Sequence, residues 1–160
     1  MNSAAITVAK MPDVWREADW QRLWLSIWSK KRQWSSLALI PAGPGTAPEV
    51  LVRIAVALAR TGTLHVKTPI HVADATRITL AELEPFSEEV AWYTGNKEMT
   101  ILALPALNEN VTALPLAKGA DCSLLCVALG DMKVADAKQT VAQIGVSNFI
   151  GSAIFRLSAG

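Results

Sequence analysis

The clearest chemical pattern in the sequence is a Gly- and Pro-rich loop, residues 41–49, between an apolar run and an apolar helix. This order is that of a phosphate-binding loop, in which backbone N–H groups surround the phosphates, a Lys contacts the terminal phosphate and a Ser or Thr binds Mg²⁺. Here Ala47 stands at or near the Lys position, followed by Pro48 and Glu49. Pro48 has no N–H to donate, and Glu49 places negative charge where an anion would lie. The loop therefore has the outline of a phosphate site without its chemistry.

A stripe of tryptophans is the second pattern. Trp20, Leu23, Trp24, Ile27 and Trp28 are spaced i, i+3, i+4, i+7 and i+8, so they lie on one face of a helix. Either this face packs on the protein's own sheet, or it binds a partner, because Trp is enriched at interface hot spots. A helix on a membrane surface is a third alternative, which the acidic residues near its start weaken. We predict these five residues to be partner-binding residues.

The histidines and cysteines of the sequence predict neither a metal site nor a disulfide. The two histidines, His65 and His71, are too few for a zinc site. Cys122 and Cys126 would share one face of a strand about 13 Å apart, too far for a disulfide, so we expect buried, reduced thiols. His71 and Asp74 point to opposite faces of a strand, so we expect structural roles rather than an acid–base pair.

Apolar strands alternate with helices along the chain, which predicts an α/β domain whose mainly parallel, five-stranded sheet has helices on both faces. The strands are predicted at residues 36–40, 69–73, 99–104, 123–129 and 148–157. The helices are predicted at residues 13–29, with Asp13 as its N-cap, and at 48–60, 79–93, 112–119 and 133–144. Gly62 is predicted to end the second helix, and Pro85 is a candidate break in the third.

The composition fits one domain, residues 13–160, behind a flexible tail, residues 1–12. The chain has 160 residues, of which 51% are hydrophobic and 18% charged. A net charge of +1 gives no footprint for nucleic acid, and the basic residues 30–32 are expected to be a solvated helix end. No signal peptide or transmembrane run is recognisable, which predicts a cytoplasmic protein.

Two further segments carry a family resemblance. The helix Arg53-Ile-Ala-Val-Ala-Leu-Ala-Arg-Thr-Gly62 follows the loop, and the run Ala117-Lys-Gly-Ala-Asp121 precedes a strand that ends before Gly130. With the loop, they resemble the ParA/MinD branch of P-loop ATPases, most closely the cytoplasmic tyrosine kinases of bacterial polysaccharide export. The resemblance covers residues 17–157 and implies a P-loop NTPase-like fold.

The family's cation-handling motifs are eroded in this chain. The motif D-x-D-x-R reads Asp74-Ala-Thr-Arg77, so that Thr76 replaces the second aspartate. The motif D-x-P places Ala103 at the aspartate that orders Mg²⁺. Phosphoryl transfer depends on positioning and charge neutralisation, and each lost electrostatic contact typically costs about 3–4 kcal/mol of barrier. We therefore predict that the protein is not an enzyme, with no catalytic residue, no metal ligand and no cofactor.

The resemblance leaves a vestigial nucleotide loop, for which it implies Gly43, Gly45, Thr46, Asp74 and, in the loop after the third strand, Asn108. We predict a pseudo-ATPase or pseudokinase that acts as an adaptor or regulatory subunit in a bacterial membrane-associated or cytoskeletal assembly, such as one for polysaccharide export. Its expected partners are proteins, a second copy of the chain among them, with no nucleic acid and with membrane association only through a partner. The alternative is a nucleotide-binding switch that binds ATP or ADP weakly with little hydrolysis.

Overall fold

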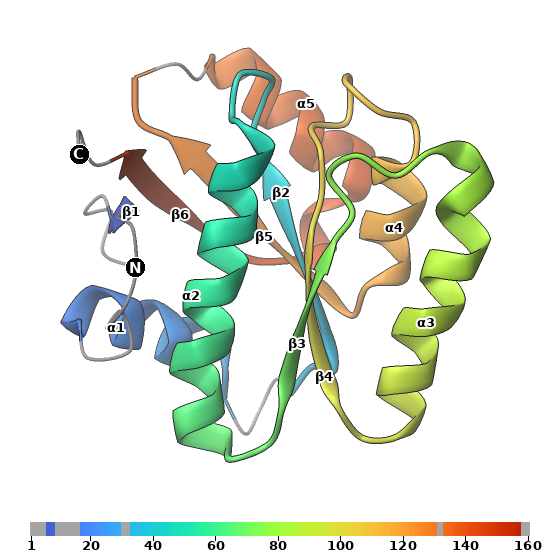
Figure 1. The fold of residues 1–160 in the computed structure, drawn as a ribbon. Helices are drawn as coiled ribbons and strands as arrows, with labels where there is room; N and C mark the ends of the chain where they lie inside the picture. Colours follow the sequence, from blue (N-terminus) through green and yellow to red (C-terminus); the bar gives the residue numbers. More distant parts are fainter. Residues whose placement is uncertain (1–5, 9–16, 30–32, 131–132, 158–160) are drawn as a thin grey trace.

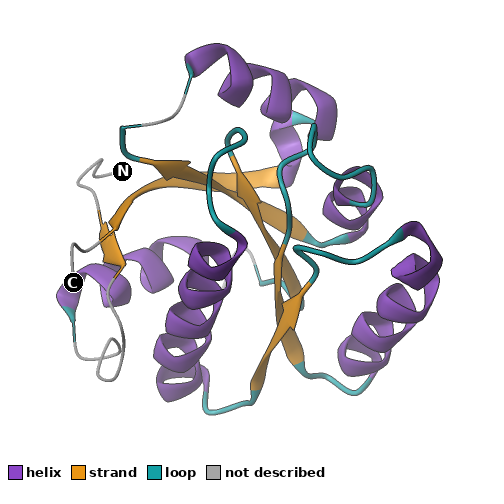
Figure 2. Cartoon of the chain, turned by 45° about the horizontal axis from the view of Figure 1, so that its top comes forward, coloured by secondary structure: helices purple, strands orange, loops and turns teal. Residues whose placement is uncertain are grey.

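The computed structural model describes residues 6–8, 17–29, 33–130 and 133–157. Within them, one parallel sheet lies between two layers of helices (Figures 1 and 2). Its strand order is β1-β6-β5-β2-β4-β3. The strands are β1 (Ile6–Val8), β2 (Ser36–Pro41), β3 (Ile70–Asp74), β4 (Met99–Ala103), β5 (Cys122–Ala128) and β6 (Phe149–Leu157). The helices are α1 (Ala18–Ile27), α2 (Pro48–Val66), α3 (Leu83–Gly95), α4 (Ala113–Gly119) and α5 (Val134–Ile144), with 3₁₀ turns η2 (Leu80–Glu82) and η3 (Val146–Asn148).

The predicted class, a parallel α/β sheet with helices on both faces, is confirmed, but the sheet has six strands rather than five. The additional strand is β1, which lies within the segment predicted to be a flexible tail and pairs in parallel with the edge of β6. Ile6 and Val8 are buried on the inner side of this strand. Three residues are too few to show a recognisable hydrophobic period in the sequence. β1 is therefore recognised only from its pairing with the edge of β6.

Two predicted helix boundaries need correction. α2 does not end at Gly62 but continues to Val66, where Lys67 takes a left-handed conformation. Gly62 instead allows a close approach, since a Cβ atom there would lie 2.6 Å from the indole of Trp24. Pro85 does not break α3, because it lies in the first turn, where a helix needs no N–H donor. Asp13, the predicted N-cap of the first helix, lies outside the described residues.

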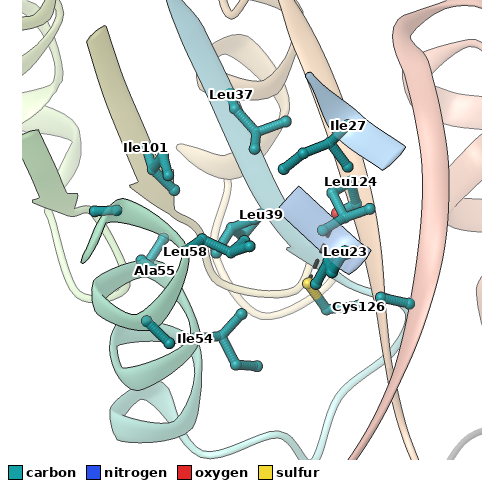
Figure 3. Close-up of a cluster of buried hydrophobic side chains, with 14 of the residues drawn as sticks. Leu23, Ile27, Leu37, Leu39, Ile54, Ala55, Leu58, Ile101, Leu124 and Cys126 are labelled. Carbon is teal, nitrogen blue, oxygen red and sulfur yellow. Dashed lines mark hydrogen bonds between the residues drawn. The ribbon is translucent and has the colours of Figure 1, made fainter. Parts of the chain in front are cut away.

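Each strand divides its side chains between the two helical layers. Along β2, Leu37 and Leu39 face the cluster beneath α1 and α2, whereas Ala38 and Ile40 face the cluster beneath α4 and α5. Figure 3 shows the first cluster, in which leucine and isoleucine side chains of α1, α2 and the central strands interdigitate. A strand that is buried on both faces explains the continuous apolar runs in the sequence.

The tryptophan stripe belongs to the α1/α2 cluster. Trp20 and Trp24 are each 1% exposed, and Leu23 and Ile27 are also buried. Trp24 stacks on the partly buried Trp28 at a centroid distance of 5.9 Å. Of the three interpretations, burial supports the core. The predicted partner-binding role is wrong for the buried side chains, which are Trp20, Leu23, Trp24 and Ile27. α1 lies against α2 and β6, so of its apolar face only Trp28 stays partly exposed.

Both cysteines are buried and free, as predicted. Burial raises the pKa of the Cys126 thiol to about 12, because an apolar environment disfavours the thiolate. None of the helices within the described ranges combines the length and apolar character needed to cross a membrane.

Candidate functional site

The loops that follow β2, β3 and β4 meet at the carboxyl edge of the sheet. The strand register places Asp74, at the end of β3, beside Ala103 at the end of β4, and Ala103 in turn beside Leu39 of β2. Gly43, Gly45 and Thr46 occupy the loop after β2. This edge is where open parallel sheets bind ligands.

The first part of the β2–α2 loop is fastened to α5. A Cβ atom at Gly43 would lie 2.9 Å from the Cβ atom of Asp136, so this glycine permits a close approach of the helix. The hydroxyl of Thr140 donates to the carbonyl oxygen of Ala42 at 3.0 Å. Gly43 therefore has a packing role, and the nearby Asp136 adds an acidic group next to the loop.

At the tip of the loop, a backbone N–H is bound by a carboxylate from the loop after β4. Gly45 has a φ of 104°, a conformation that favours glycine. Its backbone N–H donates to Oε1 of Glu109 at 3.3 Å. Glu109 therefore occupies an amide that a phosphate-binding loop would direct at its ligand.

The N-terminus of α2 is also satisfied internally. Ala47 is the N-cap residue and makes no side-chain cap. The Glu49 carboxylate accepts a hydrogen bond from Arg77 at 2.7 Å. A hydrogen bond from its own backbone N–H, and then the Arg77 guanidinium, hold the pKa of the Glu49 carboxyl below its usual value. One exposed ion pair thus joins the first turn of α2 to the loop after β3.

Asp74 is used in a local turn. Its Oδ1 accepts hydrogen bonds from the backbone N–H of Thr76 at 3.0 Å and from the Thr76 hydroxyl at 2.5 Å. Thr76 therefore holds the Asp74 carboxylate in an Asx-type turn. Ala103 is fully buried beside them and offers no ligand atom.

The loop after β4 is ordered by Asn110 rather than by Asn108. Asn110 donates from Nδ2 to the carbonyl oxygen of Ile78 and accepts from the backbone and hydroxyl of Thr112. Asn108 is exposed, and within the described residues it makes no side-chain hydrogen bond. The prediction selected Asn108 from the polar run of residues 108–110, whereas the neighbouring Glu109 is the residue that contacts the loop after β2.

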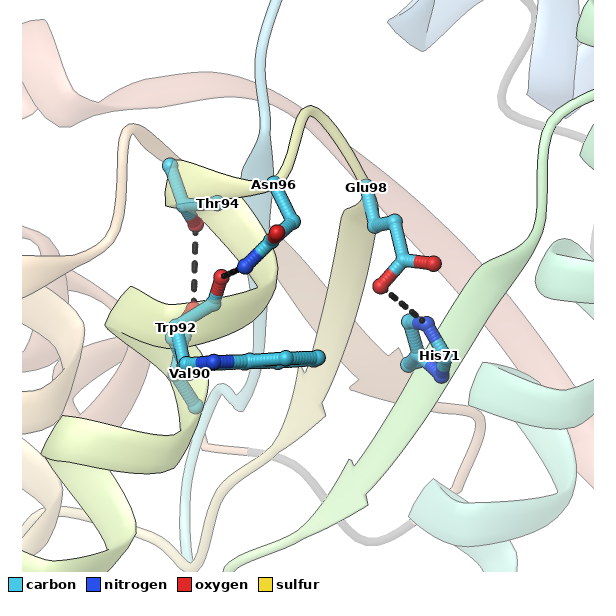
Figure 4. Close-up of polar contacts among 6 residues, drawn as sticks. All are labelled: His71, Val90, Trp92, Thr94, Asn96 and Glu98. Carbon is cyan, nitrogen blue, oxygen red and sulfur yellow. Dashed lines mark hydrogen bonds and ion pairs between the residues drawn. The ribbon is translucent and has the colours of Figure 1, made fainter.

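His71 lies apart from Asp74. Its Nε2 is 3.1 Å from Oε2 of Glu98 (Figure 4). The His71 ring stacks on Tyr93 at a centroid distance of 3.9 Å. Trp92, next to Tyr93, is largely exposed, and Asn96 donates to its carbonyl oxygen. The expected structural role of His71, bridging β3 to the loop before β4, fits this arrangement.

A cavity of about 310 Å³ opens beside the loop, on the sheet face that α1 and α2 cover. It is bordered by the loop tip, the first turns of α2 and the ends of β5 and β6. Across the part of the chain that the structure describes, three or more His, Cys, Asp or Glu side chains do not gather as metal ligands would.

Known protein families and curated proteins gave no match to this sequence. The arrangement at the carboxyl edge must therefore be interpreted from its own chemistry. That chemistry is a glycine-containing loop in which the backbone N–H of Gly45 donates to the chain's own Glu109 carboxylate.

Proposed function

We propose that this protein is a catalytically inactive, P-loop-like adaptor that acts through protein contacts. The observation that carries this proposal is the hydrogen bond from Gly45 to Glu109, which places a carboxylate on the loop amide. A phosphate at that position would face the charges of Glu109, Glu49 and Asp136. The nearby Arg77 is already paired with Glu49, so it is a poor substitute for the missing loop lysine.

Electrostatics support the proposal that the loop does not bind phosphate. A like charge within about 4–6 Å of an anion disfavours its charged form, and an exposed ion pair contributes little on its own. Without a cation, the loop lacks the neutralisation on which phosphoryl transfer depends. The resemblance to bacterial polysaccharide-export kinases then favours a scaffold kept for its shape, in a cytoplasmic complex of that kind.

We place the partner on the surface formed by α2 and β3. Within the described residues, β3 is the last strand of the sheet, so its outer backbone groups are available for pairing. An open apolar groove of about 560 Å³ runs beside it, bordered by Val56, Leu64, Ile70 and Val72. An extended segment of a partner protein can add a strand to such an edge and insert alternate side chains into the groove.

A nucleotide titration tests the inactive loop. Thermal melts are recorded with and without 10 mM ATP–Mg²⁺, with Mg²⁺ alone and with sodium sulfate at matched ionic strength as controls. The adaptor predicts no ATP-specific shift. If the protein is a nucleotide switch with a Kd of about 0.1 mM, ATP binding would raise its free energy of unfolding by about 2.7 kcal/mol and its Tm by about 5–10 °C. A shift of that size would overturn the proposal in favour of the switch.

A pair of matched variants tests the partner surface. Leu64→Glu places charge on the groove, where Leu64 is 59% exposed, whereas Leu80→Glu changes a leucine that is 69% exposed in η2. We expect Leu64→Glu to weaken association with the partner at least tenfold, and Leu80→Glu to leave it unchanged. Self-association, measured by sedimentation equilibrium, identifies a second copy as the partner if Leu64→Glu abolishes it. Equal effects of the two variants would exclude the α2/β3 surface.

A further inference from the structure

The cavity beside the loop lies where the chain changes direction across the sheet. From β2 the chain continues through α2 to β3 at one edge, whereas from β5 it continues through α5 to β6 on the other side. In open parallel sheets, the crevice between two such diverging strands is the general place for a ligand. The cavity of about 310 Å³ is bordered by the loop after β2 and by the end of β5.

The floor of the cavity is apolar. It is made by Val50 and Ile54 of α2, Cys126 of β5 and Phe155 of β6, which all belong to the α1/α2 core cluster. Ala128 lies two residues beyond Cys126 and therefore faces the same side of β5. These side chains come from three elements already fixed by the core, so the floor is rigid before any ligand arrives.

The rim adds few polar groups. Val127 and Arg156 also border the cavity, but the alternation of strands β5 and β6 directs their side chains to the opposite face. Thr46 contributes a hydroxyl that makes no hydrogen bond within the described part of the chain. Leu129, which is 57% exposed, extends the apolar surface at the mouth.

We propose that this cavity binds a small, neutral, mainly apolar molecule of about two fused rings, with one hydroxyl or carbonyl group directed at Thr46. An apolar cavity of about 150 Å³ accommodates benzene, so one of this size has room for a second ring. A charged ligand is disfavoured, because the floor offers no counter-charge and burial of an unpaired charge is costly. An anion would also meet Glu109, which already occupies the amide of Gly45.

This inference goes beyond the adaptor function and does not depend on it. The ligand is recognised by apolar contact and one hydroxyl, with no phosphate. A protein with an inactive nucleotide loop therefore retains a small-molecule site beside that loop, between the first turns of α2 and the ends of β5 and β6.

The test uses 1-naphthol as the neutral probe and 1-naphthoate as its anionic counterpart. Binding is measured by calorimetry and by methyl NMR on the full chain. We expect saturable binding of 1-naphthol below 1 mM, in the range of small apolar ligands, with shifts at the methyl groups of Val50 and Ile54. A second cavity, between α3 and α4, is bordered by Val90 and Leu116, whose methyl groups should not shift. We expect 1-naphthoate to bind at least tenfold more weakly.

A filling variant gives the mutational control. Ala128→Phe places a ring in the cavity from a half-buried position and should weaken 1-naphthol binding at least tenfold. Ala81→Phe adds the same ring on the exposed turn η2 and should leave binding unchanged. Absence of binding to the wild-type chain, shifts centred on Val90 and Leu116, or equal binding to Ala128→Phe would each overturn the proposal. If Ala128→Phe does not fold, the wild-type methyl shifts alone decide.

Discussion

The two faces of the sheet differ in how completely the helices above them bury their side chains. On the α1/α2 face, Trp20, Trp24 and Trp34 are almost completely buried, and large side chains from both helices fill the space above the strands. On the opposite face, α3 contributes no fully buried residue, and its Phe86 and Val90 are only half-buried. Figure 2 shows helices on both sides, but the packing beneath them is unequal.

Because of this difference, we expect the α1/α2 face to contribute most to folding stability and the α3 face to contribute mainly exposed surface. Trp24 is at the centre of the well-packed face, where it contacts Trp28 and Trp34 and donates from Nε1 to Nδ1 of His65 at 3.1 Å. The α3 face presents Trp92 to solvent instead. Because buried apolar area dominates folding free energy, we expect substitutions to cost much more on the first face than on the second.

The largest effect is expected from Trp24→Ala. Removal of a buried indole should lower the free energy of unfolding by about 3–5 kcal/mol, since the cavity left beneath α1 cannot fully close. Urea denaturation followed by far-UV circular dichroism measures this loss. A loss below about 1 kcal/mol would mean that α1 is a surface helix and that the contrast between the faces is wrong.

At neutral pH, Gly62→Ala should give the next largest effect. The new Cβ atom would lie 2.6 Å from the Trp24 ring and 2.7 Å from Cδ1 of Ile70, so one of these side chains must move. Overpacking of this kind typically costs about 1–3 kcal/mol, which the better helix propensity of alanine only partly offsets. Gly95→Ala is the matched control on α3, where a Cβ atom meets nothing within 4 Å, and it should be neutral or slightly stabilising.

Burial of Cys126 should make the free energy of unfolding depend on pH. Its thiol has a folded-state pKa of about 12, above the unfolded value of 9.0, so the folded state holds this proton more tightly. Its contribution is fully present below pH 9 and should be lost at about 1.4 kcal/mol per pH unit as the pH rises from about 9 to 12. Denaturation of the wild type and of Cys126→Ala across this range measures the difference, and parallel curves would contradict it.

The smallest effect is expected from Trp92→Ala. This side chain is 62% exposed on α3, so its removal should change the free energy of unfolding by less than about 0.5 kcal/mol. The same denaturation assay used for Trp24→Ala provides the comparison. A loss similar to that of Trp24→Ala would show that the α3 face is as tightly packed as the other.

Much of the fold could be predicted from local patterns. The runs around Leu37 and Leu124 are apolar on both faces, which identified buried parallel strands without any long-range information. The strand β1 could not be predicted, because three residues carry no period and depend on β6 for pairing. The end of α2 was misplaced because Gly62 is a helix breaker by propensity, whereas the ring of Trp24 requires a residue without a side chain there.

The candidate site was only partly predictable. Gly45 and Asp74 were expected near a ligand, but the partners that satisfy them, Glu109 and Thr76, follow from geometry. Thr76 is two residues from Asp74 and was open to local reasoning. Glu109 is 64 residues from Gly45, and only the meeting of two strand ends brings them together.

The sequence by itself determined the alternation of strands and helices and the absence of a lysine from the loop of residues 41–49, because both depend on residue types at short spacings. Only the tertiary structure decided where the tryptophan face lies, since Trp24 finds its hydrogen-bond acceptor 41 residues away in α2. It also decided that the loop meets a carboxylate, and that a cavity remains below it. These outcomes depend on which distant segments are brought into contact, and local propensity carries no information about such contacts.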